Sequence, residues 1–476
     1  MILGLIEPRN ICVNRRPWNR QLATIAGAAL LVAGKAQGAD SPGMAVDTDT
    51  TWVDFKSATY VQFFQRALLP GPGGAQVASD SLVPVFEYVQ LRAVGVDTPW
   101  SKDSLDFQVS GWGNGQLMES PGDPAFDGDV TVANVSHRLG PATLGFGRHV
   151  RPGGTLRVLH FDGLTFDYRA PVGIGVSGYA GLTVLPRWAQ RPGYQHLGSA
   201  PDSLLRSPDA LPEPERTGNW LGGVRLDYTN ADLGSVGASF HEEQEHAALG
   251  RRDVGLDAQV TVVDATTVTA AALLDADSTQ LADALAAVDV APADAVDLTA
   301  EFRHSDPRLL LSRQSVLSVF STSRYDELGA SGAVRFDLPL EVGAAGYLQW
   351  FGPDATGMRI RGRLRLGLDS ARRSFVSAIV GRVQEPENGY SSVRLSISYL
   401  VVEPLRTTAE HYSYFYDTPV LGVSSSSVEA VTTEWTIVDD LRVLAGGSFA
   451  RSPYASMDAQ GLVRVVYETE GRGGSQ

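Results

Sequence analysis

From about Ala58 onward, apolar residues recur at every second position, in segments of about ten residues separated by turn residues. A period of two predicts β-strands with one apolar and one polar face, whereas a helix needs a period of 3.6. The alternation is cleanest in the segments 174–184, 220–229, 253–262, 296–303 and 393–399. The sequence therefore predicts an all-β fold built from hairpins.

The connections between these segments are unequal. About 22 segments lie between residues 57 and 468, and 18–22 strands fit the pattern. Links after even-numbered segments are short, whereas the long links all follow odd-numbered segments: 67–83, 115–126, 186–216, 244–251, 305–325 and 417–426. Short turns on one side and long loops on the other are typical of a transmembrane β-barrel. We therefore expect an antiparallel barrel with periplasmic turns and extracellular loops.

A soluble all-β protein is the alternative to the barrel. Secreted sandwiches and solenoids also alternate, but no repeat of 20 to 50 residues recurs here. Charged residues make up 20% of the chain and glycine contributes 50 residues, which fits strands that present only alternate residues to lipid.

The first 39 residues have the layout of a secretory signal peptide. Arg15, Arg16 and Arg20 precede an apolar run from Leu22 to Gly34, and small residues follow. The run is too short to span a bilayer as a helix. We expect cleavage near Gly38, and a short buried N-terminal helix is the alternative. The single cysteine, Cys12, would leave with the signal, which excludes disulfides and cysteine-ligated metals.

The remaining chain is predicted to form a short periplasmic segment at 40–56, the transmembrane barrel at 57–469 and a C-terminal tail at 470–476. The segment 40–56 is too short for the globular plug that energy-coupled 22-stranded transporters carry, so we expect no plug domain. The formal net charge is -15, and no basic surface for nucleic acid is evident.

One local pattern resembles a known family. Gly145-Phe146-Gly147-Arg148-His149 is followed by Arg157 and by Phe161-Asp162-Gly163. This resembles the Gly-Arg strand and the Arg-then-Asp-Gly strand of alginate-export-type porins, and Ala58 to Thr469 resembles the porin-like outer-membrane β-barrels of Gram-negative bacteria in architecture. The resemblance implies an outer-membrane location. The chain departs from the usual terminal aromatic residue, because nine residues follow Tyr467.

The sharpest chemical feature is a row of four arginines, Arg359, Arg361, Arg363 and Arg365, which alternate with apolar residues. Arginine facing lipid near the midplane would cost roughly 2–4 kcal/mol, so the row is predicted to face the lumen. Two interpretations remain open: a basic ladder that guides anions, or an arginine–carboxylate network that stiffens the wall. Glu301, Asp337 and Glu341 are candidate partners, and the predicted lumen also includes Arg225, Asp257 and Arg303.

Other motifs give weaker signals. His241 to His246 misses the zinc-protease spacing by one residue and is expected to lie in an acidic surface loop. Loops 305–325 and 186–216 are long enough to fold inward and narrow the barrel. A cluster of aromatic residues, Tyr412, Tyr414, Phe415 and Tyr416, suggests an interfacial girdle. We expect no enzyme activity, cofactor or metal site.

The function predicted from these features is that of a porin-like channel for passive diffusion of small polar or anionic solutes. The alternative is a non-conducting structural or surface-interaction barrel. Expected partners are outer-membrane lipid and lipopolysaccharide, the barrel-assembly machinery and small polar solutes, with no nucleic acid. The default oligomeric state is a monomer.

Overall fold

The structure is a computed structural model. It describes residues 51–67, 79–98, 101–117, 126–152, 158–184, 219–245, 248–310, 324–352, 355–386, 388–453 and 455–473. The expected signal peptide, the loop 186–216, residues 311–323 of the loop 305–325, Arg157 and His246 lie outside the described residues. Among the described residues, no helix is long and apolar enough to cross a membrane.

The described residues form 23 labelled strands and one short helix, α3 (Pro307–Leu310). The strands are β1 (Thr51–Ala67), β2 (Ser79–Leu82), β3 (Pro84–Thr98), β4 (Ser101–Gln116), β5 (Phe126–Leu139), β6 (Ala142–Pro152), β7 (Val158–Arg169), β8 (Ile174–Thr183), β9 (Trp220–Asn230), β10 (Gly234–Glu245), β11 (Ala248–Val263), β12 (Thr266–Asp275), β13 (Gln280–Ala293), β14 (Val296–Ser305), β15 (Tyr325–Arg335), β16 (Leu340–Trp350), β17 (Thr356–Gly367), β18 (Phe375–Gln384), β19 (Gly389–Val402), β20 (Leu405–Val420), β21 (Val423–Val438), β22 (Leu441–Ser452) and β23 (Ala455–Gly473).

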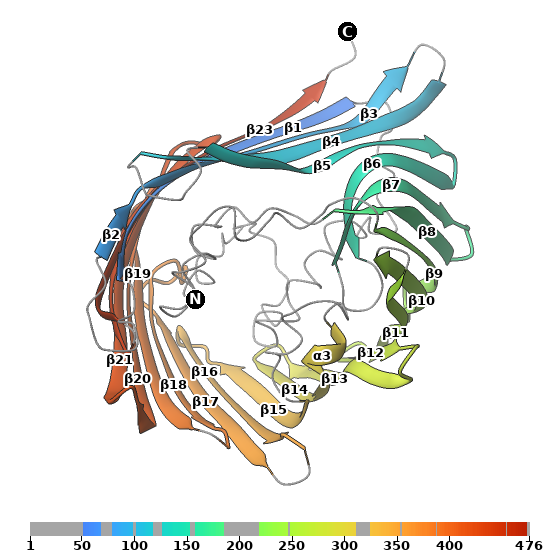
Figure 1. Ribbon diagram of the computed structural model, residues 1–476. Coiled ribbons are helices and arrows are strands. Elements are labelled where there is room, and N and C mark those ends of the chain that lie inside the picture. Colours follow the sequence, from blue (N-terminus) through green and yellow to red (C-terminus); the bar gives the residue numbers. More distant parts are fainter. Residues whose placement is uncertain are drawn as a thin grey trace. The chain divides into compact units, whose positions relative to one another are not determined.

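The strands form one antiparallel sheet that closes on itself (Figure 1). Each strand from β3 onward pairs with the next one along the chain, and β1 closes the ring by pairing with both β3 and β23. Because only Val83 separates β2 from β3 and both pair with β1, they act as one wall strand. The part of the chain that the structure describes is thus a closed barrel of 22 wall strands, which confirms the predicted fold class.

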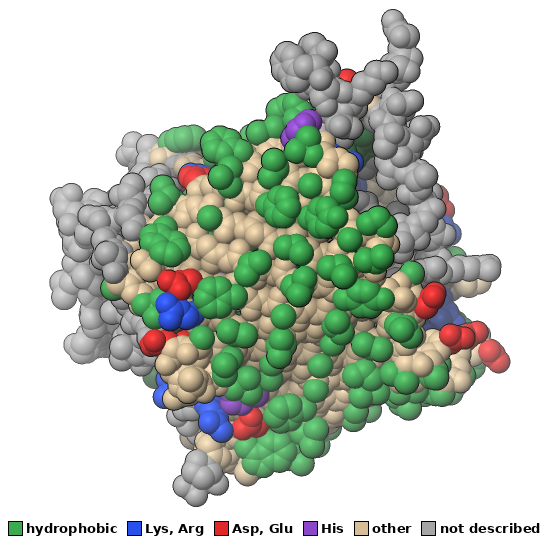
Figure 2. Space-filling model, turned by 90° about the vertical axis from the view of Figure 1, so that its right-hand side faces the viewer, with side chains coloured by type: hydrophobic (Ala, Val, Ile, Leu, Met, Phe, Trp, Pro, Cys, Tyr) green, Lys and Arg blue, Asp and Glu red, His purple; other side chains and the backbone are tan. Residues whose placement is uncertain are grey.

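The wall has an apolar outer face and a polar inner face. In β17, Ile360, Leu364 and Leu366 are exposed, while the arginines occupy the alternate positions. Exposed apolar side chains recur in the same alternation around the ring. On the face over β8 to β11, hydrophobic side chains are spread across the surface, and charged side chains gather toward its margins (Figure 2). This is the surface expected of a barrel that contacts lipid.

The wall is longer than the sequence predicts at several places. It begins at Thr51 and ends at Gly473, so it takes in residues that we expected in the terminal segments 40–56 and 470–476. The prediction of a long loop at 417–426 is wrong, because β20 and β21 are joined by Leu421 and Gly422 alone. Both have positive φ, 50° and 80°, as a tight two-residue hairpin turn requires. Likewise, most of the expected loop 244–251 belongs to β10 and β11.

The outer face gives a first prediction. Replacing Leu364, which is 45% exposed on β17, by arginine should lower the free energy of unfolding by about 2–4 kcal/mol, because a guanidinium would face the lipid core. Reversible denaturant unfolding in lipid vesicles measures this. The matched variant Ser377→Arg places the same side chain on the inner face of the neighbouring strand, at a position paired with Arg365, and an equal loss there would contradict the assignment of faces.

Candidate functional site

The arginine row lies on the inner face of β17. Its four members are register partners of Tyr347, Ala345, Gly343 and Glu341 on β16. On the other side, the row meets Val383, Gly381, Ile379 and Ser377 of β18. Arg361 lies between Ala345 and Gly381, whereas Arg363 lies between Gly343 and Ile379, so Arg361 has the smallest side chains beside it in the row.

Arg359 is fixed by contacts from two strands. Its Nη2 donates to Oε1 of Glu327 on β15 at 2.9 Å, and its guanidinium lies 4.5 Å from the centroid of the Tyr347 ring. Glu327 is a buried carboxylate that also accepts a hydrogen bond from Gln349 Nε2 at 2.7 Å. This end of the row is therefore neutralised, and its geometry is set by β15 and β16.

Two other members of the row have different neighbours. Arg363 Nη2 lies 3.6 Å from Oε1 of Glu341, a looser ion pair in which both side chains are about one quarter exposed. The Arg365 guanidinium lies 3.9 Å from the centroid of the Phe375 ring on β18, which is a close cation–π contact. Three of the four arginines are thus held against the wall by ion pairs or cation–π contacts.

Arg361 forms no ion pair within 4 Å among the residues that the structure describes. The positive charges of Arg359 and Arg363 repel its guanidinium, and the carboxylate of Glu301 attracts it. On the inner faces of β16, β17 and β18, the four arginines meet one carboxylate, Glu341. Even with Glu327 from β15, this stretch of wall keeps a local excess of positive charge.

Of the three acids that we expected to face the row, only one pairs with it. Glu341 forms an ion pair with Arg363, while Glu301 hydrogen bonds to the Tyr347 side chain. Asp337 is wrong as a partner, because it lies in the turn between β15 and β16. Arg303 is on the same wall, with its Nη2 3.9 Å from Asp283 Oδ2 on β13. Glu327 has the shortest ion pair with the row, and the sequence did not predict it because only the register of β15 brings it next to Arg359.

Arg225 and Asp257 lie on a separate stretch of wall, on β9 and β11. Arg225 Nη1 and Nη2 both donate to the Asp257 carboxylate, at 2.5 and 2.7 Å. The strand between them, β10, carries Gly237 at the crossing point, and a Cβ there would lie 2.2 Å from Arg225 Nη2. The glycine therefore lets the arginine reach across one strand to the next.

The same device recurs elsewhere on the inner face. Tyr347 crosses Gly329 of β15 on its way to Glu301, and a Cβ on that glycine would lie 2.2 Å from the Tyr347 ring. Tyr179 of β8 crosses Gly223 of β9, and its hydroxyl lies 3.2 Å from His241 Nδ1 on β10. Inward glycines thus position long polar side chains two strands away.

This arrangement gives a second prediction. Gly237→Val should separate Arg225 from Asp257 and lower the free energy of unfolding by about 1–3 kcal/mol, because the added methyl groups occupy the path of the guanidinium. The control is Gly346→Val, since an added Cβ at Gly346 meets no atom within 4 Å, and its change should stay within about 0.5 kcal/mol. Denaturant unfolding measures the free energy of unfolding of both variants. Equal losses of stability would contradict the path of Arg225 over Gly237.

The expected aromatic girdle at residues 412–416 is wrong. Phe415 alone of the four points outward, at 51% exposure. Tyr412 is buried on the inner face under the Arg394 guanidinium, and the Tyr416 hydroxyl hydrogen bonds to Ser426 Oγ. Tyr414 contacts Tyr390 with ring centroids 5.7 Å apart. Residues two apart in a strand share one face, so three of these rings belong inside.

The histidine-rich motif also differs from expectation. His241 to Glu245 belong to β10 and do not lie in a loop. His241 is buried on the inner face, with its Nε2 3.9 Å from Glu243 Oε2 and its ring centroid 6.1 Å from that of the tilted Tyr179 ring. No group of three or more possible metal ligands occurs in the described ranges.

The Gly-Arg and Asp-Gly halves of the porin-like motif lie side by side. Arg148 of β6 and Asp162 of β7 are register partners, and the guanidinium donates to both carboxylate oxygens at 2.7 and 2.8 Å. Both residues fall in the outward alternation of Phe146 and Leu164. The motif therefore forms a cross-strand ion pair on the outer side of the wall.

Comparisons with known proteins agree with the architecture. No protein-family model matches the sequence, and no curated protein matches it. Among solved structures, a mutant of the ferric enterobactin receptor PfeA from Pseudomonas aeruginosa is 11% identical, with 88% of this chain and 80% of that chain covered at a TM-score of 0.52. The chain therefore shares the fold of that receptor. At such low identity the likeness shows the fold alone.

Two further solved structures align with this chain over nearly their whole length. The outer membrane protein opdK from Pseudomonas aeruginosa is 10% identical, covering 88% of this chain and 99% of that one at a TM-score of 0.38. OccAB3 from Acinetobacter baumannii is also 10% identical, with the same coverage and a TM-score of 0.43.

Proposed function

We propose that the barrel is a porin-like channel for passive diffusion of small polar solutes, with a preference for anions. The observation that carries the proposal is the arginine row, in which Arg361 has no ion pair among the described residues and the wall around it holds more arginines than carboxylates. A structural network would pair each arginine with an acid.

The net charge of the chain is negative, but selectivity depends on the charges nearest the path. Field lines from fixed charges are focused in a water-filled lumen with a low-dielectric wall. The members of the row alternate along one strand, so successive guanidinium groups are about 7 Å apart. An anion can pass from one to the next without losing its favourable electrostatic energy.

The second candidate is a non-conducting structural barrel. It is favoured by the paired arginines elsewhere on the inner face, including Arg225 with Asp257 and Arg359 with Glu327. A barrel whose inner face is stiffened in this way needs no solute.

A liposome-swelling assay separates the two. Purified barrel in vesicles should admit arabinose, and should admit its carboxylate arabinonate faster, because the two solutes have nearly the same size and differ in charge. Vesicles that do not swell with either solute favour the structural barrel. Faster entry of the neutral sugar would support a channel but contradict its preference for anions.

The remaining partners follow from the location. The outer face contacts membrane lipid, and we propose lipopolysaccharide and the barrel-assembly machinery as further partners. The proposal includes no enzymatic step.

A further inference from the structure

The outer face of β20 and β21 is polar where that of the neighbouring strand β19 is apolar. Six outward residues form what we call the outer polar patch: Thr407, His411, Ser413, Ser427, Glu429 and Thr433. They share the alternation of Phe415, Val431 and Trp435, which are 51%, 52% and 49% exposed. On the neighbouring strand β19, the corresponding outward residues Leu395 and Ile397 are apolar.

The patch lies at mid-height in the wall. Trp435 is the register partner of Leu405, and Phe415 lies ten residues further along β20, so the two aromatic residues bracket a band about 25 Å tall for strands tilted by about 40°. His411 and Glu429 are register partners about 15 Å above Trp435. This is the depth at which lipid headgroups are out of reach.

The polar groups of the patch are connected to one another but not covered. His411 Nδ1 lies 3.2 Å from Glu429 Oε1, and its Nε2 lies 2.7 Å from Ser413 Oγ. The side chains of His411 and Glu429 nevertheless remain 41% and 50% exposed. A half-exposed ion pair that faces hydrocarbon is unfavourable, so the pair indicates a polar neighbour.

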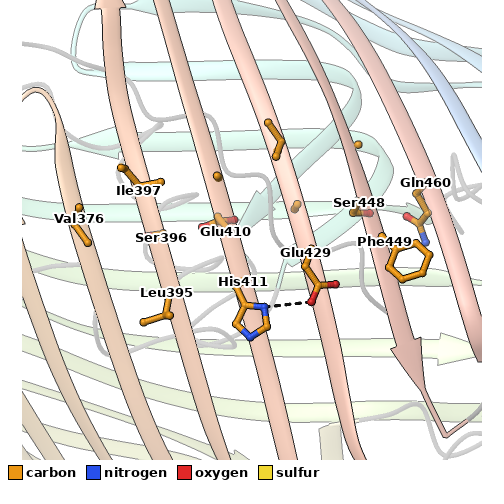
Figure 3. A pocket seen from close by; sticks show the side chains of 14 residues that line it. Val376, Leu395, Ser396, Ile397, Glu410, His411, Glu429, Ser448, Phe449 and Gln460 are labelled. Atoms are coloured by element: carbon orange, nitrogen blue, oxygen red, sulfur yellow. Dashed lines mark ion pairs between the residues drawn. The ribbon is translucent and has the colours of Figure 1, made fainter.

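A groove of about 730 Å³ runs beside the pair (Figure 3). Ala409 and Gly447 are its small outward residues, and Leu395, Ile397, Val431 and Phe449 supply apolar sides. The figure shows His411 and Glu429 joined across neighbouring strands, with Leu395 to one side and Phe449 to the other. The surface thus combines an apolar hollow with an ion pair that lies across its centre.

We propose that the outer polar patch and its groove bind a second copy of this chain. Two copies inserted in the same orientation can be related only by an axis along the membrane normal, which keeps every residue at its own depth. Because His411 and Glu429 lie at nearly the same depth, a two-fold axis can bring the histidine of each copy to the glutamate of the other. An acyl chain fits the groove but offers nothing to the ion pair.

The test uses single-cysteine variants in intact outer membranes, since the chain beyond residue 39 has no cysteine. With a bis-maleimide linker of about 10 Å, Ser413→Cys should give at least ten times more product of twice the chain mass than Gly362→Cys, an outward position on β17. Equal yields, or a product of another mass, would overturn the proposal, since the latter indicates a different protein.

A second measurement tests the same proposal without a linker. Light scattering of the barrel in lipid nanodiscs should give a dimer, and the double variant His411→Leu with Glu429→Leu should give a monomer with unchanged heat-modifiable mobility. A monomer before substitution, with or without co-purified lipid, would overturn the proposal. A dimer that persists in the double variant would move the interface away from the patch.

Discussion

Replacing Arg361 and Arg363 together by glutamine should lower the anion-to-cation permeability ratio about sevenfold at 0.1 M salt. A unit charge about 7 Å from a passing ion contributes about 0.6 kcal/mol in water, and screening at this salt concentration roughly halves it. The loss of one charge then lowers the anion permeability about 1.6-fold and raises the cation permeability about 1.6-fold. The loss of two charges applies both factors twice, which gives the sevenfold change in the ratio. Reversal potentials across a salt gradient measure the ratio.

Two controls give this result its meaning. Arg373→Gln removes a positive charge from the turn between β17 and β18, where Arg373 pairs with Glu403, and should leave the ratio unchanged. Arg361→Gln alone should alter the ratio with little loss of stability, because Arg361 has no ion pair in the described part of the wall. A network with a structural role predicts the reverse: lower stability in the double variant, with Glu341 unpaired, at unchanged selectivity.

Glu327→Leu should lower the free energy of unfolding by about 3–5 kcal/mol. The buried Glu327 carboxylate binds Arg359 and Gln349, so its removal costs a charge-assisted hydrogen bond and leaves the buried Gln349 amide unsatisfied. The same change removes a negative charge beside the row, so a channel that still folds should become more anion-selective. Denaturant unfolding and reversal potentials measure the two effects.

Two related variants complete the comparison. Glu327→Gln keeps an acceptor for its neighbours and should cost clearly less than leucine. Glu434→Gln removes an exposed carboxylate on the inner face of β21, for which no ion pair occurs among the described residues, and its effect on stability should stay within about 0.5 kcal/mol. If Glu434→Gln and Glu327→Leu destabilise equally, Glu327 does not hold Arg359 in place.

The alternation of the sequence was sufficient for the fold class and for a strand number of about 22, because the side-chain period in a strand depends only on local backbone geometry. The same rule would have placed Tyr412, Tyr414 and Tyr416 inside, opposite Phe415. The long hairpin at Leu421 and Gly422 was missed because serine-rich strand ends resemble a loop in composition.

What the sequence could not supply was register. Glu327 meets Arg359, and Arg225 crosses Gly237 to reach Asp257, only because strands distant by tens of residues are aligned in one particular way. The polarity of His411 and Glu429 is visible in the sequence, but their pairing on the outer face at one depth depends on the alignment of β20 with β21.

Single-channel recording in planar bilayers tests the central claim most directly. Barrel refolded from purified chain should conduct in steps, with a reversal potential in a salt gradient that reports anion preference, and the Arg361→Gln, Arg363→Gln double variant should conduct with that preference reduced. The absence of conductance across salts and voltages, from protein whose heat-modifiable mobility shows a folded barrel, would contradict the channel and favour the structural barrel.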